Sequence, residues 1–206
     1  MIVIIDYGIG NLMSIKNMLK KAGFGDVIIS SKEEDILTAD KLILPGVGNF
    51  DYGMTHLENA GFIDTLNKKV LHDKTPILGI CLGAQLLTKG SEEGNRSGLS
   101  WVNAKTVRFD PLKMSSNHKV PHMGWGDVKL RKESKLFDNM PSAARFYFVH
   151  SYHIQCEHAV DELLSCDYGY MFTAGIEHEN IIGVQFHPEK SHKFGLTLLR
   201  NFVQNY

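Results

Sequence analysis

The sequence has no surplus of either charge, few cysteines and no long apolar run. Its 206 residues include 22 basic and 23 acidic ones, so the net charge of −1 gives no electrostatic reason to expect nucleic acid or an anionic membrane as partner. No apolar run approaches the ~20 residues that a membrane span needs. The apolar start, Ile2 to Asp6, lacks a basic beginning, so we predict a first strand rather than a signal peptide. The cysteines, Cys81, Cys156 and Cys166, are widely spaced, which favours reduced thiols and a cytoplasmic location.

Nucleotide and metal motifs are also missing. Met13 stands where a dinucleotide-binding fingerprint needs its third glycine, and the sequence has no phosphate-binding loop of the G-x-x-x-x-G-K-[ST] type. His118 and His122 are four residues apart, but Pro121 between them argues against a shared helix face. We therefore expect no metal site and no organic cofactor.

Strand-like and helical patterns alternate in the first half of the chain. Apolar runs at 2–6, 27–29, 41–44 and 77–80 predict strands, and the segments between them predict helices, including one at 50–72 broken near Gly61. The second half is mostly strand-like, at 102–109, 127–130, 145–150, 171–176 and 181–185, before a closing helix at 195–204. This order predicts one α/β domain, residues 1–206, with an open, mostly parallel central sheet flanked by helices and an added antiparallel portion.

The most informative stretch runs from Thr75 to Leu87 (TPILGICLGAQLL). Its apolar run predicts a buried strand that ends at Cys81, and the residues after it predict a helix. Gly79 and Gly83 lie two residues to either side of Cys81, the spacing of a strand-to-helix elbow that presents a nucleophile. The start of the helix favours a thiolate and offers the backbone N–H of Leu82 to an oxyanion. A small buried cysteine at the end of a core strand is the alternative interpretation.

A candidate base for this cysteine lies near the C-terminus. The stretch Ile182 to Lys190 (IGVQFHPEK) predicts a buried strand that ends near His187, with Glu189 two residues later. A cysteine nucleophile needs a base that accepts and returns its proton, and the base needs a hydrogen-bond partner that fixes its tautomer. We therefore predict a Cys81–His187–Glu189 triad. By itself, His-Pro-Glu is an ordinary exit from a strand.

The segment Pro45 to Gly48 follows the third predicted strand. Loops at the carboxyl ends of parallel strands are where open α/β sheets bind ligands. Gly46 and Gly48 would let the backbone N–H of Val47 turn inward without a clash. The same residues also suit a plain turn between a strand and a helix, so both interpretations stay open on this segment alone.

In combination these segments resemble a known family. The elbow around Cys81 and the stretch QFHPEKS at 185–191 are similar to class I (triad) glutamine amidotransferases. Four further segments resemble the glutaminase subunit of imidazole glycerol phosphate synthase from end to end: DYGIGN at 6–11, LPGVG at 44–48, VPHMGW at 120–125 and YFVHSY at 147–152.

The resemblance implies a reaction and a partner. Cys81 attacks the side-chain amide of glutamine, His187 protonates the departing ammonia and then activates water, and Glu189 orients His187. The oxyanion is held by the backbone N–H groups of Val47 and Leu82. The substrate glutamine lies among Gly46, Gly48, Gln85, Ser151 and Tyr152. Ammonia passes to a separate (βα)8-barrel synthase subunit in a heterodimer, and the positions that match the partner-facing ones are Asn11, Tyr147 and Lys190.

Some positions depart from the family pattern. Gly126 stands where Asn usually follows Gly-Trp, and Ala84 stands where Met is common after Cys-Leu-Gly. We expect Ala84 to be a mild packing change, and Gly126 to loosen the backbone and affect coupling to the partner. Segments at 50–54, 98–101 and 191–195 look more like a paralogous branch whose partners amidinate sugars for surface polysaccharides. The sequence leaves the ammonia acceptor open.

Two other classes of function are alternatives. A cysteine peptidase or chaperone-like hydrolase on the same scaffold usually has histidine directly after the elbow cysteine, where this chain has Leu82. A catalytically idle subunit that only shapes its partner would not need an intact triad. For an active glutaminase we expect low activity in the isolated chain, because the loop around Val47 is misaligned until a partner docks.

Overall fold

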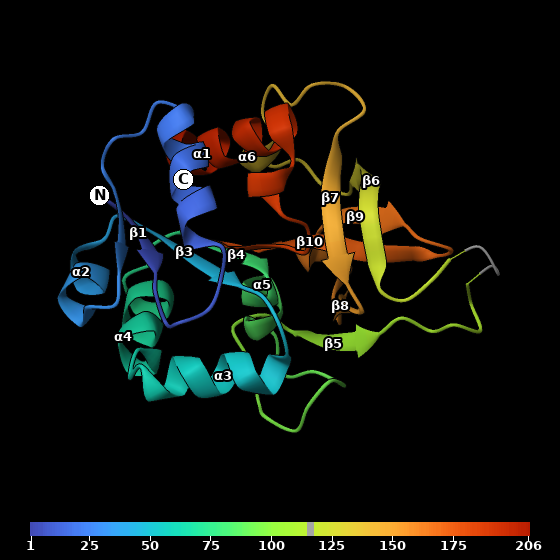
Figure 1. The fold of residues 1–206 in the computed structure, drawn as a ribbon, viewed down its shortest axis with the longest axis horizontal. Helices are drawn as coiled ribbons and strands as arrows, with labels where there is room; N and C mark the ends of the chain where they lie inside the picture. The colour runs from blue at the N-terminus through green and yellow to red at the C-terminus, as the bar shows by residue number, and fades with distance from the viewer. Residues whose placement is uncertain (115–117) are drawn as a thin grey trace.

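A computed structural model describes residues 1–114 and 118–206 (Figure 1). One mixed sheet has the strand order β2-β1-β3-β4-β11-β10-β9-β6-β7, and β8 pairs with both β10 and β5 beside this path. In chain order, the strands are β1 (Ile2–Ile5), β2 (Val27–Ser30), β3 (Lys41–Gly46), β4 (Ile77–Cys81), β5 (Ala104–Arg108), β6 (His122–Leu130), β7 (Arg145–His150), β8 (Tyr152–Cys156), β9 (Glu162–Asp167), β10 (Met171–His178) and β11 (Ile181–Val184).

The sheet changes character at β11. The strands β2, β1, β3, β4 and β11 pair in parallel, whereas β10 pairs antiparallel with β11 and the antiparallel pattern continues through β9, β6 and β7. Strands β1, β4 and β11 are buried at every position, as expected for parallel strands covered on both faces. The predicted architecture, a parallel core with an added antiparallel portion, is confirmed.

Helices cover both faces of the parallel half (Figure 1). The helices are α1 (Leu12–Lys21), α2 (Glu33–Thr38), α3 (Phe50–Asn59), α4 (Ile63–Asn67), α5 (Leu82–Leu86) and α6 (His192–Asn205), with short turns η1 (Lys68–His72), η2 (Lys135–Phe137), η3 (Ala159–Asp161) and η4 (Pro188–Lys190). Buried side chains of α1 and α6 share one apolar cluster, and those of α2 to α5 share another. The sheet therefore separates two cores.

This topology brings the two informative sequence stretches together. β4 and β11 are parallel neighbours with Gly79 opposite Gly183 and Ile80 opposite Val184. Their carboxyl ends therefore lie at the same edge of the sheet, where Cys81 ends one strand and the chain leads from the other to His187. In open α/β sheets this edge is where ligands bind.

The structure differs from the sequence-based expectations mainly in the antiparallel half. β8 and β9 were not predicted, and β6 begins at His122 rather than near Asp127. The early part of β6 contains Gly124 and Gly126, which are weak strand formers, and its ladder pairs them with Phe148 and Phe146 of β7. Long-range pairing with bulky aromatic residues thus overrides the local preference.

Gly126 does not loosen the backbone, contrary to expectation. It lies in the regular β6–β7 ladder opposite Phe146. A Cβ atom at this position would lie 2.8 Å from Cys166 Sγ and 2.9 Å from Phe148 Cε2. Since a larger residue would point into the core, glycine here is a consequence of interior packing against Cys166 and Phe148.

Candidate active site

Cys81 occupies a strand-to-helix elbow between β4 and α5. Its backbone angles, φ 55° and ψ −112°, are strained for a residue with a side chain. A Cβ atom on Gly79 would lie 2.8 Å from the backbone N of Ala84, and one on Gly83 would lie 1.9 Å from the carbonyl O of Leu44. The flanking positions therefore have no room for side chains, which explains why both are glycine.

Gly83→Ala should damage the fold because its Cβ would overlap the Leu44 carbonyl. We expect the free energy of unfolding to fall by about 3 kcal/mol or more, as for severe overpacking. The matched control is Gly25→Ala, where no atom lies within 4 Å of the new Cβ. That variant should stay within ~0.5 kcal/mol of wild type. Urea unfolding measures both, and equal effects on the two variants would contradict the elbow geometry.

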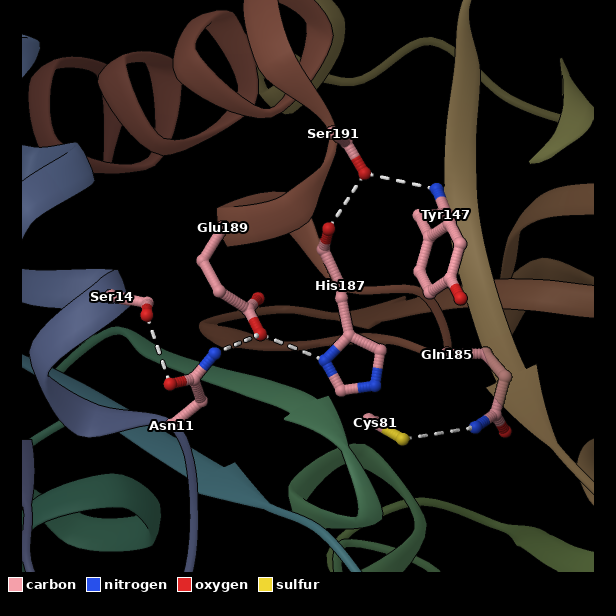
Figure 2. A network of polar contacts seen from close by, with 8 residues as sticks. All are labelled: Asn11, Ser14, Cys81, Tyr147, Gln185, His187, Glu189 and Ser191. Carbon is pink, nitrogen blue, oxygen red and sulfur yellow. Dashed lines mark hydrogen bonds and ion pairs between the residues drawn. The ribbon is translucent and has the colours of Figure 1, made fainter. Parts of the chain in front are cut away.

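His187 and Glu189 form a buried pair beside the elbow (Figure 2). The distance from His187 Nδ1 to Glu189 Oε1 is 2.9 Å, and the two side chains are only 2% and 1% exposed. Asn11 Nδ2 donates to the same carboxylate oxygen at 3.4 Å, and Ser14 Oγ donates to Asn11 Oδ1 at 2.9 Å. Glu189 is thus placed to fix the tautomer of His187 with a proton on Nδ1, leaving Nε2 as the basic nitrogen.

The basic nitrogen of His187 faces the Cys81 sulfur (Figure 2). Within the described residues, this buried Nε2 has no hydrogen bond of ordinary geometry. Burial by itself lowers the pKa of His187, but the Cys81 sulfur and the Glu189 carboxylate outweigh burial and raise it to about 9. An imidazolium is therefore stabilised next to the sulfur, as proton transfer from a thiol to an imidazole requires.

The raised pKa makes the stability contributed by this pair depend on pH. Because about 9 lies above the ordinary value of 6.5, the contribution is fully present below pH 6.5 and is lost as pH rises through 9. Glu189→Gln removes the carboxylate, so the difference in unfolding free energy between wild type and variant should shrink over this range. Denaturant unfolding at a series of pH values measures it. A difference that stays constant or grows with pH would contradict the assignment.

A cavity of about 410 Å³ opens over the triad. It is lined by Val47, Gly48, Cys81, Leu82, Gln85, Glu93, Pro121, Val149, His150, Ser151, Tyr152, His187 and Lys190. This set includes every residue expected to bind substrate or hold the oxyanion except Gly46. Gly46 lies buried at the end of β3, where a Cβ would approach Gly83 N to 2.7 Å and Tyr7 Oη to 2.9 Å. The close packing against the elbow thus requires glycine at this position.

The loop after β3 forms one wall of the cavity. The Val47 side chain is exposed, and Gly48 has φ 101°, a conformation that residues with side chains rarely adopt. The hydroxyl of Tyr7 donates to the carbonyl of Pro45 at 2.6 Å and so anchors the base of the loop. No role was predicted for Tyr7, although it lies in the DYGIGN segment that carries the family resemblance.

Two polar residues of the cavity were also missed. Glu93 lies in the polar segment 90–98, for which the sequence predicted no function, yet it lines the cavity, and its Oε2 accepts a hydrogen bond from Phe50 N at 2.8 Å. An acidic residue in a polar loop carries no local signal for this position. His150 also lines the cavity and is buried, and it was hidden among ten histidines.

The residues expected to face a partner have mixed surroundings. Lys190 is exposed at the cavity, with its Nζ 5.8 Å from the ring centre of the half-buried Tyr147. Asn11 stands at the N-terminus of α1, but its side chain makes no capping bond and instead contacts Glu189 and Ser14. Asn11 therefore contacts the triad through Glu189, the member that lies outside the cavity lining.

Neither other cysteine resembles a nucleophile. Burial is the main cause that raises the pKa of Cys156 and that of Cys166 to about 12, and all three cysteines are free. Residues 1–114 and 118–206 contain no group of three or more histidine, cysteine or acidic side chains that could hold a metal ion. Nor does any helix in these ranges have the length and apolar character to cross a membrane.

A cysteine elbow, a buried His–Glu pair and a cavity over both are the arrangement expected of a triad amidotransferase, and sequence comparison shows the family. The chain matches the family described as glutamine amidotransferase class-I over residues 3–205 and belongs to it. Subunit HisH 2 of imidazole glycerol phosphate synthase from Methanococcus maripaludis is 56% identical, and its namesake from Pseudomonas aeruginosa is 48% identical, each over 204 residues and 99% of both chains. Within the family, the chain is one of the HisH glutaminase subunits.

Solved structures agree on the fold. A protein from Thermoplasma acidophilum, described as part of a GMP synthase, has a TM-score of 0.70 at 24% identity, over 98% of this chain and 91% of that one. A glutamine amidotransferase from Thermotoga maritima has a TM-score of 0.68 at 16% identity, over 99% and 96%. At these identities the likeness establishes the α/β architecture.

Proposed function

We propose that this chain is the glutaminase of a two-subunit imidazole glycerol phosphate synthase: it hydrolyses glutamine and passes the ammonia to a (βα)8-barrel synthase partner in histidine biosynthesis. The observation that carries the proposal is the Cys81–His187–Glu189 arrangement under an open cavity. Its volume of about 410 Å³ lies within the ~300–1,000 Å³ usual for small-molecule sites. The free thiols at Cys81, Cys156 and Cys166 support a cytoplasmic location.

The first half of the reaction forms a thioester. His187 Nε2 takes the thiol proton to give a thiolate–imidazolium pair, and the Cys81 sulfur then attacks the side-chain amide carbon of glutamine. The negative charge moves to the amide oxygen, where the backbone N–H groups of Val47 and Leu82 stabilise it. The imidazolium then gives its proton to the amide nitrogen, the C–N bond breaks, and ammonia leaves a γ-glutamyl thioester on Cys81.

The second half returns the enzyme to its starting state. Neutral His187 removes a proton from water, and the hydroxide attacks the thioester carbon. The C–S bond breaks, the sulfur recovers its proton from the imidazolium, and glutamate leaves. Glu189 stabilises the imidazolium in both halves without itself taking up a proton.

The cavity walls suit the other end of glutamine, which carries an α-ammonium and an α-carboxylate. Glu93 offers a carboxylate to the ammonium, and Lys190 offers a cation to the α-carboxylate. Ser151, which follows β7, and Tyr152, which begins β8, also line the cavity. We therefore add Glu93 to the proposed substrate site.

An apolar strip supports a partner next to this site. On the outer face of the β6–β7 pair, Met123 is 61% exposed and Trp125 is 38% exposed. Their cross-strand neighbours are Val149, which lines the cavity, and Tyr147. The apolar strip therefore begins at the mouth of the cavity and extends away from it. A synthase subunit that receives ammonia from the cavity would dock on this strip. Free ammonium at neutral pH is a poor nucleophile, so transfer without mixing with solvent has a chemical reason.

Trp125→Ala should weaken binding of the synthase partner by tenfold or more, since large exposed aromatic residues supply much of the affinity at interfaces. The Trp125 ring stacks on the His192 ring with the two centres 5.5 Å apart, and Arg145 Cζ lies 5.5 Å from the centre of the Trp125 ring. These contacts hold the side chain in place before docking. Calorimetric titration with the partner measures the affinity. Val160→Ala, which truncates another exposed apolar residue away from the strip, is the control. Equal effects of the two changes would contradict this docking face.

The proposed function is tested by glutamate release with and without the barrel partner and its ribonucleotide acceptor. We expect slow hydrolysis by the isolated chain and strong stimulation by partner plus acceptor, as the Val47 loop is brought into line. Full activity of the isolated chain would contradict the loop argument. Stimulation only by a synthase-like protein that amidinates sugars would show that the chain belongs to the paralogous branch. Cleavage of peptides without glutamine turnover would favour a hydrolase.

A further inference from the structure

A continuous row of hydrogen bonds joins the start of β6 to the Cys81 sulfur, and it includes His122, His150 and Gln185, to which the mechanism above gives no role. In order, the contacts are His122 Nδ1 to His150 Nε2 (3.1 Å), His150 Nδ1 to the Tyr152 carbonyl (2.8 Å), Gln85 Nε2 to the same carbonyl (3.1 Å), Gln85 Nε2 to Gln185 Oε1 (3.1 Å) and Gln185 Nε2 to Cys81 Sγ (3.9 Å). Figure 2 shows the last of these contacts.

The Tyr152 carbonyl fixes the orientation of both glutamine amides. A carbonyl oxygen can only accept, so the Gln85 atom beside it must be the amide nitrogen. The second N–H of that nitrogen points at Gln185, whose nearer atom must then be its oxygen. The remaining nitrogen of Gln185 consequently faces the sulfur as a donor.

The same carbonyl fixes the tautomers on the other side. His150 must carry its proton on Nδ1 to donate to Tyr152, so its Nε2 accepts from His122. Burial lowers the pKa of His150 well below its ordinary value and that of His122 to about 4. Both rings therefore stay neutral at neutral pH; His122 donates to His150, and His150 donates to the carbonyl.

The arrangement leaves one polar group of Gln85 for a ligand. Both N–H groups of Gln85 are used internally, and the residue lines the cavity, so its Oε1 is the acceptor that remains for the substrate. Gln185 itself is fully buried and does not line the cavity. It can act on the reaction only through Gln85 and through the sulfur.

We propose that Gln185 is a positioning residue of the glutaminase: its amide N–H stabilises negative charge on the Cys81 sulfur, and its amide oxygen holds Gln85 with Oε1 toward the bound glutamine. The contact of 3.9 Å is long, as contacts to sulfur are, and it strengthens when the sulfur becomes a thiolate. The second half of this proposal rests on the proposed function, whereas the contact with the sulfur does not.

Two variants separate the two contacts. Gln185→Met has similar length and removes both of them. Gln185→Glu keeps an oxygen for Gln85 but places an acceptor, rather than a donor, beside the sulfur. The rate of Cys81 alkylation by iodoacetamide, followed against pH on the folded chain, reports on the sulfur without any glutamine. His187 and Tyr7, the titratable groups that face Cys81, are the same in all variants.

At neutral pH we expect alkylation to slow about tenfold in Gln185→Met, which corresponds to the loss of one charge-assisted hydrogen bond, with the pH profile displaced upward. Gln185→Glu should slow alkylation at least as much. For glutamine hydrolysis in the complex, both variants should lose kcat, but only Gln185→Met should raise KM, since Gln85 is still held in Gln185→Glu. A general loss of packing would not produce this split.

The matched control is Gln155→Met, the same change at an exposed position of β8 outside the row. It should leave the alkylation profile, kcat and KM unchanged. A wild-type alkylation profile in either folded Gln185 variant would overturn the proposal. If Gln185→Met does not fold, the alkylation profile of Gln185→Glu tests the proposal by itself. Should the wild type hydrolyse no glutamine, the proposed function fails, and the alkylation difference still tests the contact with the sulfur.

Discussion

Cys81→Ala is expected to abolish glutamine hydrolysis, with a loss of at least roughly ten-thousand-fold, as when a triad nucleophile is removed. Without the sulfur no thioester can form, and no other cysteine can substitute. Burial raises the pKa of Cys156 and of Cys166 to about 12, so neither thiol ionises near neutral pH. Glutamate release by the complex with the synthase partner measures the loss.

The variant should fold as the wild type does. Alanine keeps the Cβ that the strained backbone at position 81 already accommodates, so we expect the same circular dichroism and the same partner affinity. Cys156→Ala is the control, since this half-buried thiol lies outside the cavity and its removal should leave activity intact. Glutaminase activity that survives in Cys81→Ala would end the assignment of the nucleophile.

The second large effect is expected for His187→Asn. Asparagine can still hydrogen-bond to Glu189 but cannot take the thiol proton or return it to ammonia. We expect kcat to fall by roughly a thousand-fold to ten-thousand-fold, because the residue acts in both halves of the reaction. Alkylation of Cys81 should slow as well, since the imidazole faces the sulfur.

A second histidine–carboxylate pair provides the control. His178 Nδ1 lies 2.8 Å from Asp161 Oδ1, on β10 and outside the cavity. His178→Asn should therefore keep wild-type turnover, although it makes the same change in a pair of similar geometry. Comparable losses in the two variants would mean that the effect reflects general damage to the fold and not proton transfer by His187.

The triad could be predicted because its signals are local in sequence. The glycines around Cys81 and the two-residue spacing of His187 and Glu189 each reflect a turn of a few residues. The parallel sheet then brings the two turns together, since β4 and β11 are neighbours with their carboxyl ends at one edge. The sequence did not predict this pairing, because β11 lies in the strand-rich second half; the triad was predicted from the base and the carboxylate that a cysteine nucleophile requires.

The walls of the cavity depend on contacts that leave no local trace. Glu93 belongs to a polar loop and accepts a hydrogen bond from Phe50 N, far away in the sequence. His150 ends β7, and its ring packs against those of Phe148 and Phe109. β8 and β9 escaped prediction because their residues alternate weakly between buried and exposed positions. Gly46 was assigned to substrate binding by resemblance, and the structure adds a packing reason for glycine there, since an added Cβ would lie 2.7 Å from Gly83 N.

The most direct test is to treat the complex with a glutamine-like chloroketone and to map the modified peptide by mass spectrometry. If the thiol of the elbow is the group that attacks glutamine, the label falls on Cys81 alone, and an excess of glutamine prevents it. A label on Cys156 or Cys166, or no label on a complex that still turns over glutamine, would contradict the account.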